Sequence, residues 1–131
     1  MIVLDASVVL ELVLRTVRGR QLLPRILDPA ESLVAPHLID VEVIQVLRRY
    51  VLANQMGSDR AAAALEDFLD LPIQRYPHAP FSRRIWEMRN NITAYDAAYV
   101  SLAEALCAPL ITLDGRLAEA PGHSAKIELV D

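Results

Sequence analysis

The sequence predicts an α/β fold in which helices cover both faces of a parallel sheet. Short apolar runs bounded by proline or polar residues alternate with longer helical patterns, which is typical of such a sheet. The first run, Ile2–Leu4, is apolar at every position, as expected for a strand buried on both faces. The length of 131 residues is typical of one domain, which we expect to span residues 1–131.

The first half of the chain contains two predicted strand–helix units. Residues 1–4 form the first strand, and Ser7 is placed to cap a helix from Val8 to about Leu14. The second strand, Ser32–Pro36, ends at its proline, and a long helix follows from about His37 to Ala53.

The second half continues the alternation. After Gly57, the same signals predict a helix capped by Ser58, a strand between Pro72 and Pro77, and a helix over residues 80–89. Another helix begins at Thr93 and leads to a strand that ends at Asp114, with a brief helical turn after it. A last strand is predicted over Lys126–Val130.

Composition excludes several classes of protein. With 53% hydrophobic and 23% charged residues the chain is globular rather than disordered. No apolar run approaches the roughly 18 residues of a membrane span, and no signal peptide is visible, so we expect a cytoplasmic protein. Cys107 is the only cysteine, which excludes an internal disulfide and predicts a small core residue.

The net charge of −4 disfavours a nucleic-acid partner, but the distribution of basic residues is more informative. Twelve of the thirteen are arginine, in groups such as Arg15 to Arg25, Arg48 with Arg49, and Arg83 to Arg89. Most are expected on solvated helix faces. Phosphate binding by one of the groups is the alternative.

Acidic residues follow two of the predicted strands. Asp5 ends the first strand and Asp114 ends the strand "LITL", so both are expected at the carboxyl rim of the sheet, where sites form in open α/β folds. Asp96 lies in the first turn of the helix before that second strand. It heads an apolar stripe that continues through Val100, while Ser101 is expected on the solvated side.

Glu42 is expected at the same rim. It lies on the border of the apolar face of the 37–53 helix, within two turns of the end of the second strand. Four carboxylates at one rim would repel one another and raise each other's pKa unless a cation lay between them. Mg²⁺ or Mn²⁺, which prefer oxygen ligands, is the simplest partner.

Each acid also has a purely structural explanation. Thr93-x-x-Asp96 resembles a capping box, Asp114 can begin a turn with Gly115, Asp5 can accept hydrogen bonds from a helix start, and Glu42 can be an ordinary border residue. The coincidence of all four at one rim is what favours a site. Other site types lack their motifs: no zinc-ligand spacing, no phosphate-binding glycine loop and no nucleophile elbow is present.

Three stretches make the chain resemble a PIN-domain ribonuclease, specifically a VapC-type toxin of a type II toxin–antitoxin pair. They are "MIVLDASV", "APHLIDVEVIQVLRR" and "TAYDAAYVSLAEALCAPLITLDGRL", the last being the most specific. The resemblance covers essentially the whole chain. It implies a PIN-like three-layer α/β/α domain with a central, mostly parallel sheet of about five strands.

The resemblance also implies the site and its chemistry. Asp5, Glu42, Asp96 and Asp114 match the family's catalytic, metal-binding acids, and Ser7, Thr93 and Thr112 match small polar residues beside them. The implied activity is Mg²⁺-dependent (or Mn²⁺-dependent) endonucleolytic cleavage of RNA, such as a tRNA loop, by in-line attack of water, leaving 5′-phosphate and 3′-hydroxyl ends. Gly115 follows Asp114 where many relatives have another acid, so one well-held ion is expected.

The expected partners follow from the same resemblance. They are the RNA substrate, a cognate VapB-type antitoxin whose tail crosses the rim, and a second copy of the chain, giving a homodimer and a toxin–antitoxin hetero-oligomer without membrane attachment. Apolar residues on helices that could serve such contacts, or equally the core, are Leu65, Phe68, Leu69, Trp86 and Met88.

Two alternatives remain open. A phosphatase or receiver domain would use Asp5 as a phosphorylated nucleophile, but Ser7 stands where such phosphatases have a second aspartate, and the only lysine, Lys126, precedes its strand. A catalytically idle PIN-fold module that binds RNA or protein would retain the fold without cleavage. Incubation with RNA in the presence of metal or chelator distinguishes it from a nuclease.

Overall fold

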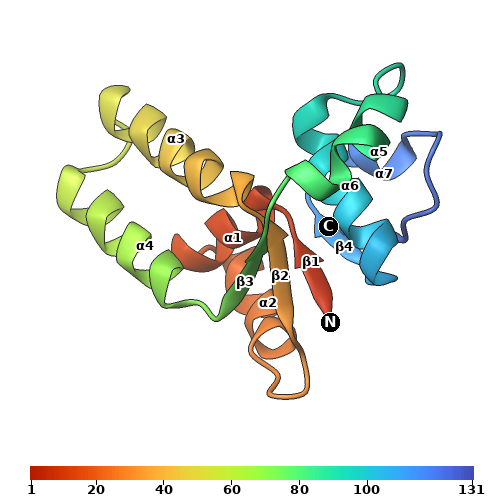
Figure 1. Cartoon of the computed structure of the whole chain (residues 1–131). Coiled ribbons are helices and arrows are strands. Elements are labelled where there is room, and N and C mark those ends of the chain that lie inside the picture. The colour runs from red at the N-terminus through yellow and green to blue at the C-terminus, as the bar shows by residue number, and fades with distance from the viewer.

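The computed structural model describes residues 1–131 and contains one five-stranded sheet (Figure 1). Every neighbouring pair of strands is parallel, and the order across the sheet is β3-β2-β1-β4-β5. The strands are β1 (Ile2–Leu4), β2 (Leu33–Pro36), β3 (Ile73–Tyr76), β4 (Leu110–Thr112) and β5 (Ile127–Leu129). This confirms the predicted parallel sheet of about five strands.

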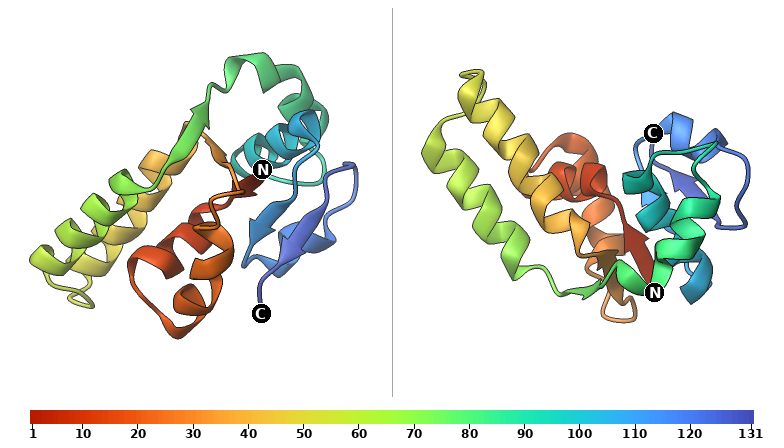
Figure 2. Two further views of the ribbon diagram at one scale, coloured as in Figure 1. Left: turned by 90° about the horizontal axis from the view of Figure 1, so that it is seen from below. Right: turned by 45° about the horizontal axis from the view of Figure 1, so that its top comes forward.

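Helices form a layer on each side of the sheet, which confirms the three-layer α/β/α prediction. Helices α1 to α4 lie on one side and α5 to α7 on the other (Figure 1). Figure 2 shows α3 and α4 side by side, projecting away from the sheet. The helices are α1 (Ala6–Val13), α2 (Val17–Ile26), α3 (Leu38–Leu52), α4 (Ser58–Asp70), the 3₁₀ turn η1 (Ala79–Phe81), α5 (Ser82–Glu87), α6 (Ala94–Leu106) and α7 (Gly115–Glu119).

The connections create a switch point between β1 and β4. The chain leaves β1 through α1 and α2 to reach β2 on one side, and leaves β4 through α7 to reach β5 on the other. Because the two crossovers diverge, the carboxyl ends of β1 and β4 open into a crevice, the usual place for a ligand in open α/β sheets. Asp5 and Asp114 follow these two strands.

The core explains why the short strands are stable. β1, β2 and β4 are buried at every position, between α6 on one face and α1 and α3 on the other. The core cluster of 29 buried residues includes Phe68 and Met88. Of the five apolar residues that could serve either protein contacts or the core, these two are therefore core, whereas Leu69 and Trp86 are exposed.

Helix α2 was not predicted. Thr16 caps it by accepting a hydrogen bond from the backbone N–H of Gly19 at 3.0 Å. Gly19 packs directly on α1, since a Cβ there would lie 2.0 Å from the carbonyl oxygen of Glu11. Pro24 lies inside the helix. Gly19 and Pro24 lower the helix propensity of this segment, so the sequence pattern does not predict α2. Close packing on α1 sets the position of the helix.

Two predicted caps and two predicted environments were wrong. Asp5 and Gly57 occupy the N-cap positions of α1 and α4, so neither Ser7 nor Ser58 is the cap residue. Cys107 is exposed and ends α6 in a left-handed conformation (φ 50°), so it is not a core residue. Ser101, expected on a solvated face, is only 2% exposed because α6 is covered nearly all round.

None of the helices combines the length and the apolar character that crossing a bilayer requires.

Candidate active site

Four carboxylates from separate parts of the sequence line one cavity of about 850 Å³. They come from the end of β1, from α3, from the first turn of α6 and from the turn after β4, and they are Asp5, Glu42, Asp96 and Asp114. The cavity lies at the switch point of the sheet. The structure therefore brings together the four acids that the sequence analysis expected at one rim.

Asp5 is held by two hydroxyl groups. Ser7 Oγ donates to Asp5 Oδ2 at 2.8 Å, and Thr112 Oγ1 donates to the same oxygen at 2.6 Å. Each hydroxyl in turn accepts a backbone N–H from the turn after β4, from Leu113 at 3.2 Å and from Asp114 at 3.1 Å. The arrangement fixes one carboxylate oxygen of Asp5 and leaves Oδ1 without a hydrogen bond from the chain.

Glu42 is held by a buried tyrosine on the neighbouring helix. The hydroxyl of Tyr99 in α6 donates to Glu42 Oε1 at 2.6 Å. Burial raises the pKa of Glu42, the Tyr99 hydrogen bond opposes this by lowering it, and the charges of Asp5 and Asp96 raise it further. The net direction is upward, so Glu42 holds its proton more tightly than an exposed glutamate does.

Asp96 and Thr93 form the start of α6 as the capping hypothesis predicted. Thr93 Oγ1 accepts the backbone N–H of Asp96 at 3.1 Å. Burial raises the pKa of Asp96, and the charges of Asp5 and Asp114 raise it further. The structural role of Thr93 and the location of Asp96 at the cavity are therefore compatible.

Asp114 is the most exposed of the four. It is the N-cap of α7, where its Oδ1 accepts the backbone N–H of Arg116 at 2.9 Å. The turn with Gly115 that the sequence predicted is present, and it directs the acid to the shared cavity.

The charge of the cluster is not neutralised within the chain. The ion pairs of the structure involve other acids, namely Glu11, Glu31, Asp40, Asp67, Glu87, Glu104 and Glu128. The four cavity acids form none, and burial, together with repulsion among the acids, raises the pKa of Glu42 and of Asp96. Carboxylate oxygens that lack a cationic partner within the chain are suitable ligands for Mg²⁺ or Mn²⁺. The side chains as they stand form no closed group of three or more metal ligands, so the site is a charge cluster rather than a preformed cage.

The sequence analysis missed Tyr99, which holds Glu42, and did not point to the cavity residues Arg49 and Tyr95. Tyr99 falls within the motif T-x-x-D-A-x-Y, but its contact with Glu42 depends on the packing of α6 against α3. Arg49 and Tyr95 line the cavity, and Tyr95 is 64% exposed. The position of Tyr95 directly before Asp96 is the sequence feature that could have predicted its place in the cavity.

Comparison with known proteins identifies the family of the chain. The PIN domain family matches residues 2–122. Ribonuclease VapC12 of Mycobacterium tuberculosis is 45% identical over 130 residues, which cover 99% of both chains. Ribonuclease VapC1 of the same organism is 50% identical over 97 residues, 73% of each chain.

A solved structure supports the fold independently. A chain in the crystal structure of VapBC2 from Rickettsia felis, bound to a DNA fragment from its promoter, superposes with a TM-score of 0.73. The superposition covers 100% of both chains at only 16% sequence identity, so it speaks for the fold alone. The family match and the two relatives show that this chain belongs to the PIN-domain family and is a VapC-type member of it.

Proposed function

We propose that the protein is a metal-dependent endoribonuclease and the toxin of a type II toxin–antitoxin pair. The observation that carries the proposal is the cavity of four carboxylates, none of them ion-paired. A cluster of unneutralised acids destabilises a fold, so its presence calls for a cation supplied from outside the chain. The similarity to ribonucleases VapC12 and VapC1 supports RNA as the substrate.

Asp5, Glu42, Asp96 and Asp114 would hold the ion, which we expect to be Mg²⁺, with Mn²⁺ as a substitute. A divalent ion there supplies a Lewis acid that activates water and offsets negative charge on phosphate oxygens. The unbonded Oδ1 of Asp5 is available as a ligand because Ser7 and Thr112 both use Oδ2.

The chain's own groups then divide the remaining work. Ser7 and Thr112 keep Asp5 in one orientation, and Tyr99 keeps Glu42 in another. One of the two carboxylates whose pKa is raised by burial, Glu42 or Asp96, would accept a proton from the attacking water. In-line attack would break the bond to the ribose 3′-oxygen and leave 5′-phosphate and 3′-hydroxyl ends. A structured RNA such as a tRNA loop is the proposed target.

The proposed partners are a VapB-type antitoxin and a second copy of the chain. The VapBC2 structure is a complex of both component types, which supports the antitoxin. Exposed apolar residues such as Leu52 on α3 and Leu69 on α4 supply surface for protein contacts. We place the protein in the cytoplasm, where its RNA substrate lies.

The test is incubation of the purified protein with a total tRNA pool in Mg²⁺, in Mn²⁺ and in chelator. We expect RNA fragments only where metal is present, and none from a folded Asp96→Asn variant. Asp70→Asn, an exposed acid at the end of α4, is the matched control and should cleave normally. Intact RNA in every lane would instead favour the catalytically idle binding module.

A further inference from the structure

A second cavity adjoins the acidic one and contains two arginines as well as two of its acids. Asp96 and Asp114 line both cavities. The second has a volume of about 480 Å³ and lies between the α5–α6 loop and α7. We call it the arginine cavity, and its remaining walls are formed by Arg89, Asn90, Asn91, Ile92, Thr93, Arg116 and Leu117.

The two arginines of this cavity are unpaired. Side-chain cations of the chain that form ion pairs are Arg15, Arg18, Arg25, Arg75, Arg84 and Lys126. Arg89 and Arg116 are not among them, although two carboxylates share their cavity. Arg89 Nη1 donates only to the backbone carbonyl of Trp86, at 3.0 Å. Guanidinium groups left free beside a nuclease-type site are suited to a phosphate.

An aromatic surface lies next to these charges. The guanidinium of Arg89 lies 4.5 Å from the centroid of the Trp86 ring, and Trp86 is 66% exposed. An exposed indole with a stacked arginine is a common platform for an unpaired nucleobase. Phosphate binding alone would not require it.

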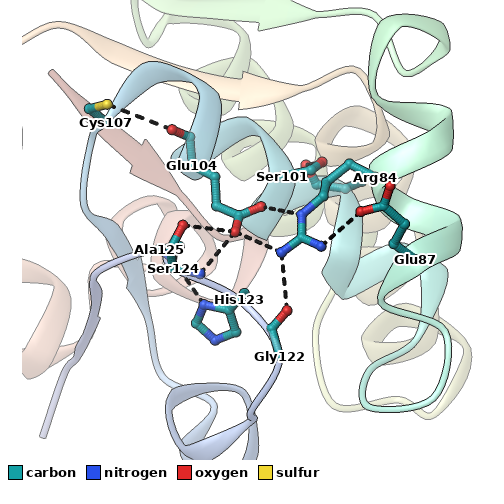
Figure 3. A network of polar contacts seen from close by, with 10 residues as sticks. Arg84, Glu87, Ser101, Glu104, Cys107, Gly122, His123, Ser124 and Ala125 are labelled. Carbon is teal, nitrogen blue, oxygen red and sulfur yellow. Dashed lines mark hydrogen bonds and ion pairs between the residues drawn. The ribbon is translucent and has the colours of Figure 1, made fainter.

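The polar network of Figure 3 joins α5, α6 and the segment before β5. Arg84 on α5 donates to both carboxylate oxygens of Glu104 on α6, at 2.8 and 2.9 Å, and to the carbonyl of Gly122 at 3.0 Å. Glu104 also accepts the N–H and hydroxyl of Ser124. Gly122 (φ +90°) packs so closely on the cavity residue Asn91 that a Cβ there would lie 2.3 Å from its amide nitrogen. The α5–α6 loop therefore packs, through Asn91, against the segment that this network joins to α5 and α6.

We propose that the arginine cavity binds one nucleotide of single-stranded RNA beside the phosphate that is cut, with Arg89 and Arg116 on a backbone phosphate and Trp86 stacked on a base. The inference rests on the proposed function, because the shared Asp96 and Asp114 place this nucleotide next to the carboxylate cluster. It adds that the substrate must present an unpaired base on the α5–α7 side of the cluster.

The test measures binding without cleavage. A fluorescein-labelled single-stranded RNA and the same RNA as a duplex are titrated in chelator and followed by anisotropy. Arg89→Ala/Arg116→Ala should weaken single-strand binding about tenfold or more and reduce the magnitude of the slope of log K against log salt by about 0.7, the value for one phosphate contact. Trp86→Ala should weaken single-strand binding about tenfold but leave duplex binding nearly unchanged.

Arg83→Ala is the matched control, because Arg83 is an exposed arginine on α5, the helix that carries Trp86. It lines neither cavity and forms no ion pair. Its binding should match that of the wild type. Equal binding by all variants, or equal loss with Arg83→Ala, would overturn the inference even if RNA is cleaved in Mg²⁺. Conversely, binding that depends on the three residues supports it even if no cleavage is seen, in which case the proposed function alone fails.

Discussion

The hydroxyl of Tyr99 donates a 2.6 Å hydrogen bond to Glu42 Oε1 and so joins α6 to α3 at the acidic cavity. Tyr99 is only 1% exposed, and burial together with the bond to Glu42 raises its pKa, so it remains a donor throughout the working pH range. The bond orients a carboxylate that would otherwise be repelled by Asp5 and Asp96. We regard Tyr99 as a positioning residue for Glu42.

Tyr99→Phe should therefore change the pH dependence of cleavage as well as its rate. Loss of the hydrogen bond removes a factor that lowers the pKa of Glu42, so the pKa rises and the acidic limb of the pH–rate profile moves to higher pH. We expect activity to fall about 10- to 100-fold at neutral pH, as for other groups that orient metal ligands.

Tyr95→Phe is the control for this prediction, since Tyr95 lines the acidic cavity but is exposed and donates no hydrogen bond to a carboxylate. Its pH–rate profile should be that of the wild type. An unshifted profile for Tyr99→Phe would show that the bond has only a structural role.

Asp96→Asn should stabilise the metal-free protein. The folded state raises the pKa of Asp96 above its ordinary value of 3.8, chiefly by burial and then by the charges of Asp5 and Asp114. A raised acid pKa means that stability is lost as pH rises from the unfolded value through the folded one. The variant should thus have a higher Tm than the wild type at pH 7 in chelator, and the advantage should vanish at about pH 3.

Saturating Mg²⁺ should reverse this order, because an ion that binds only the folded wild type raises its stability by about 2.7 kcal/mol at a concentration 100 times Kd. Thermal melts with and without metal measure both effects. A wild type that melts above Asp96→Asn in chelator would contradict the view that Asp96 is a strained acid.

Glu104 should have the opposite pH dependence, because it is paired. The hydrogen bonds from Arg84 lower the pKa of Glu104 to about 2. Its contribution to stability is present above the ordinary value of 4.5 and is lost as pH falls toward 2. Glu104→Gln should cost about 1 to 2 kcal/mol at pH 7, since Arg84 is partly solvated, and this cost should shrink below pH 4.5 and disappear as pH falls through about 2.

Urea unfolding at several pH values provides the measurement, with Glu66→Gln on α4 as the unpaired control. A pH-independent difference between the wild type and Glu104→Gln would mean that the Arg84 pair does not hold the pKa down.

The sheet could be predicted because each strand is marked locally. Runs such as Ile2–Leu4 and Leu110–Thr112 are apolar at positions that only a doubly covered strand buries. Helix α2 could not be predicted, since Gly19 and Pro24 oppose helix by propensity and are accommodated by close packing on α1. The predicted exposure of Ser101 was wrong because amphipathic analysis assumes one solvated face, and α6 is covered nearly all round along its middle. The predicted burial of Cys107 was wrong because this residue lies at the C-cap, past the covered part of the helix.

The four acids could be placed together because strand ends and helix starts converge in any parallel α/β sheet. Their partners could not be derived so simply. Thr112 and Ser7 share one oxygen of Asp5, and Tyr99 reaches Glu42 across 57 positions of sequence. Such contacts depend on the packing of one helix against another, which a single sequence does not specify.

The central claim, that Asp5 and Asp96 share one bound cation, is tested most directly by calorimetric titration with Mn²⁺. We predict saturable binding to the wild type and to Asp70→Asn, and at least about tenfold weaker binding to Asp5→Asn and to Asp96→Asn alike. Mn²⁺ binding that is unchanged in either site variant, with the fold intact by circular dichroism, would contradict the account.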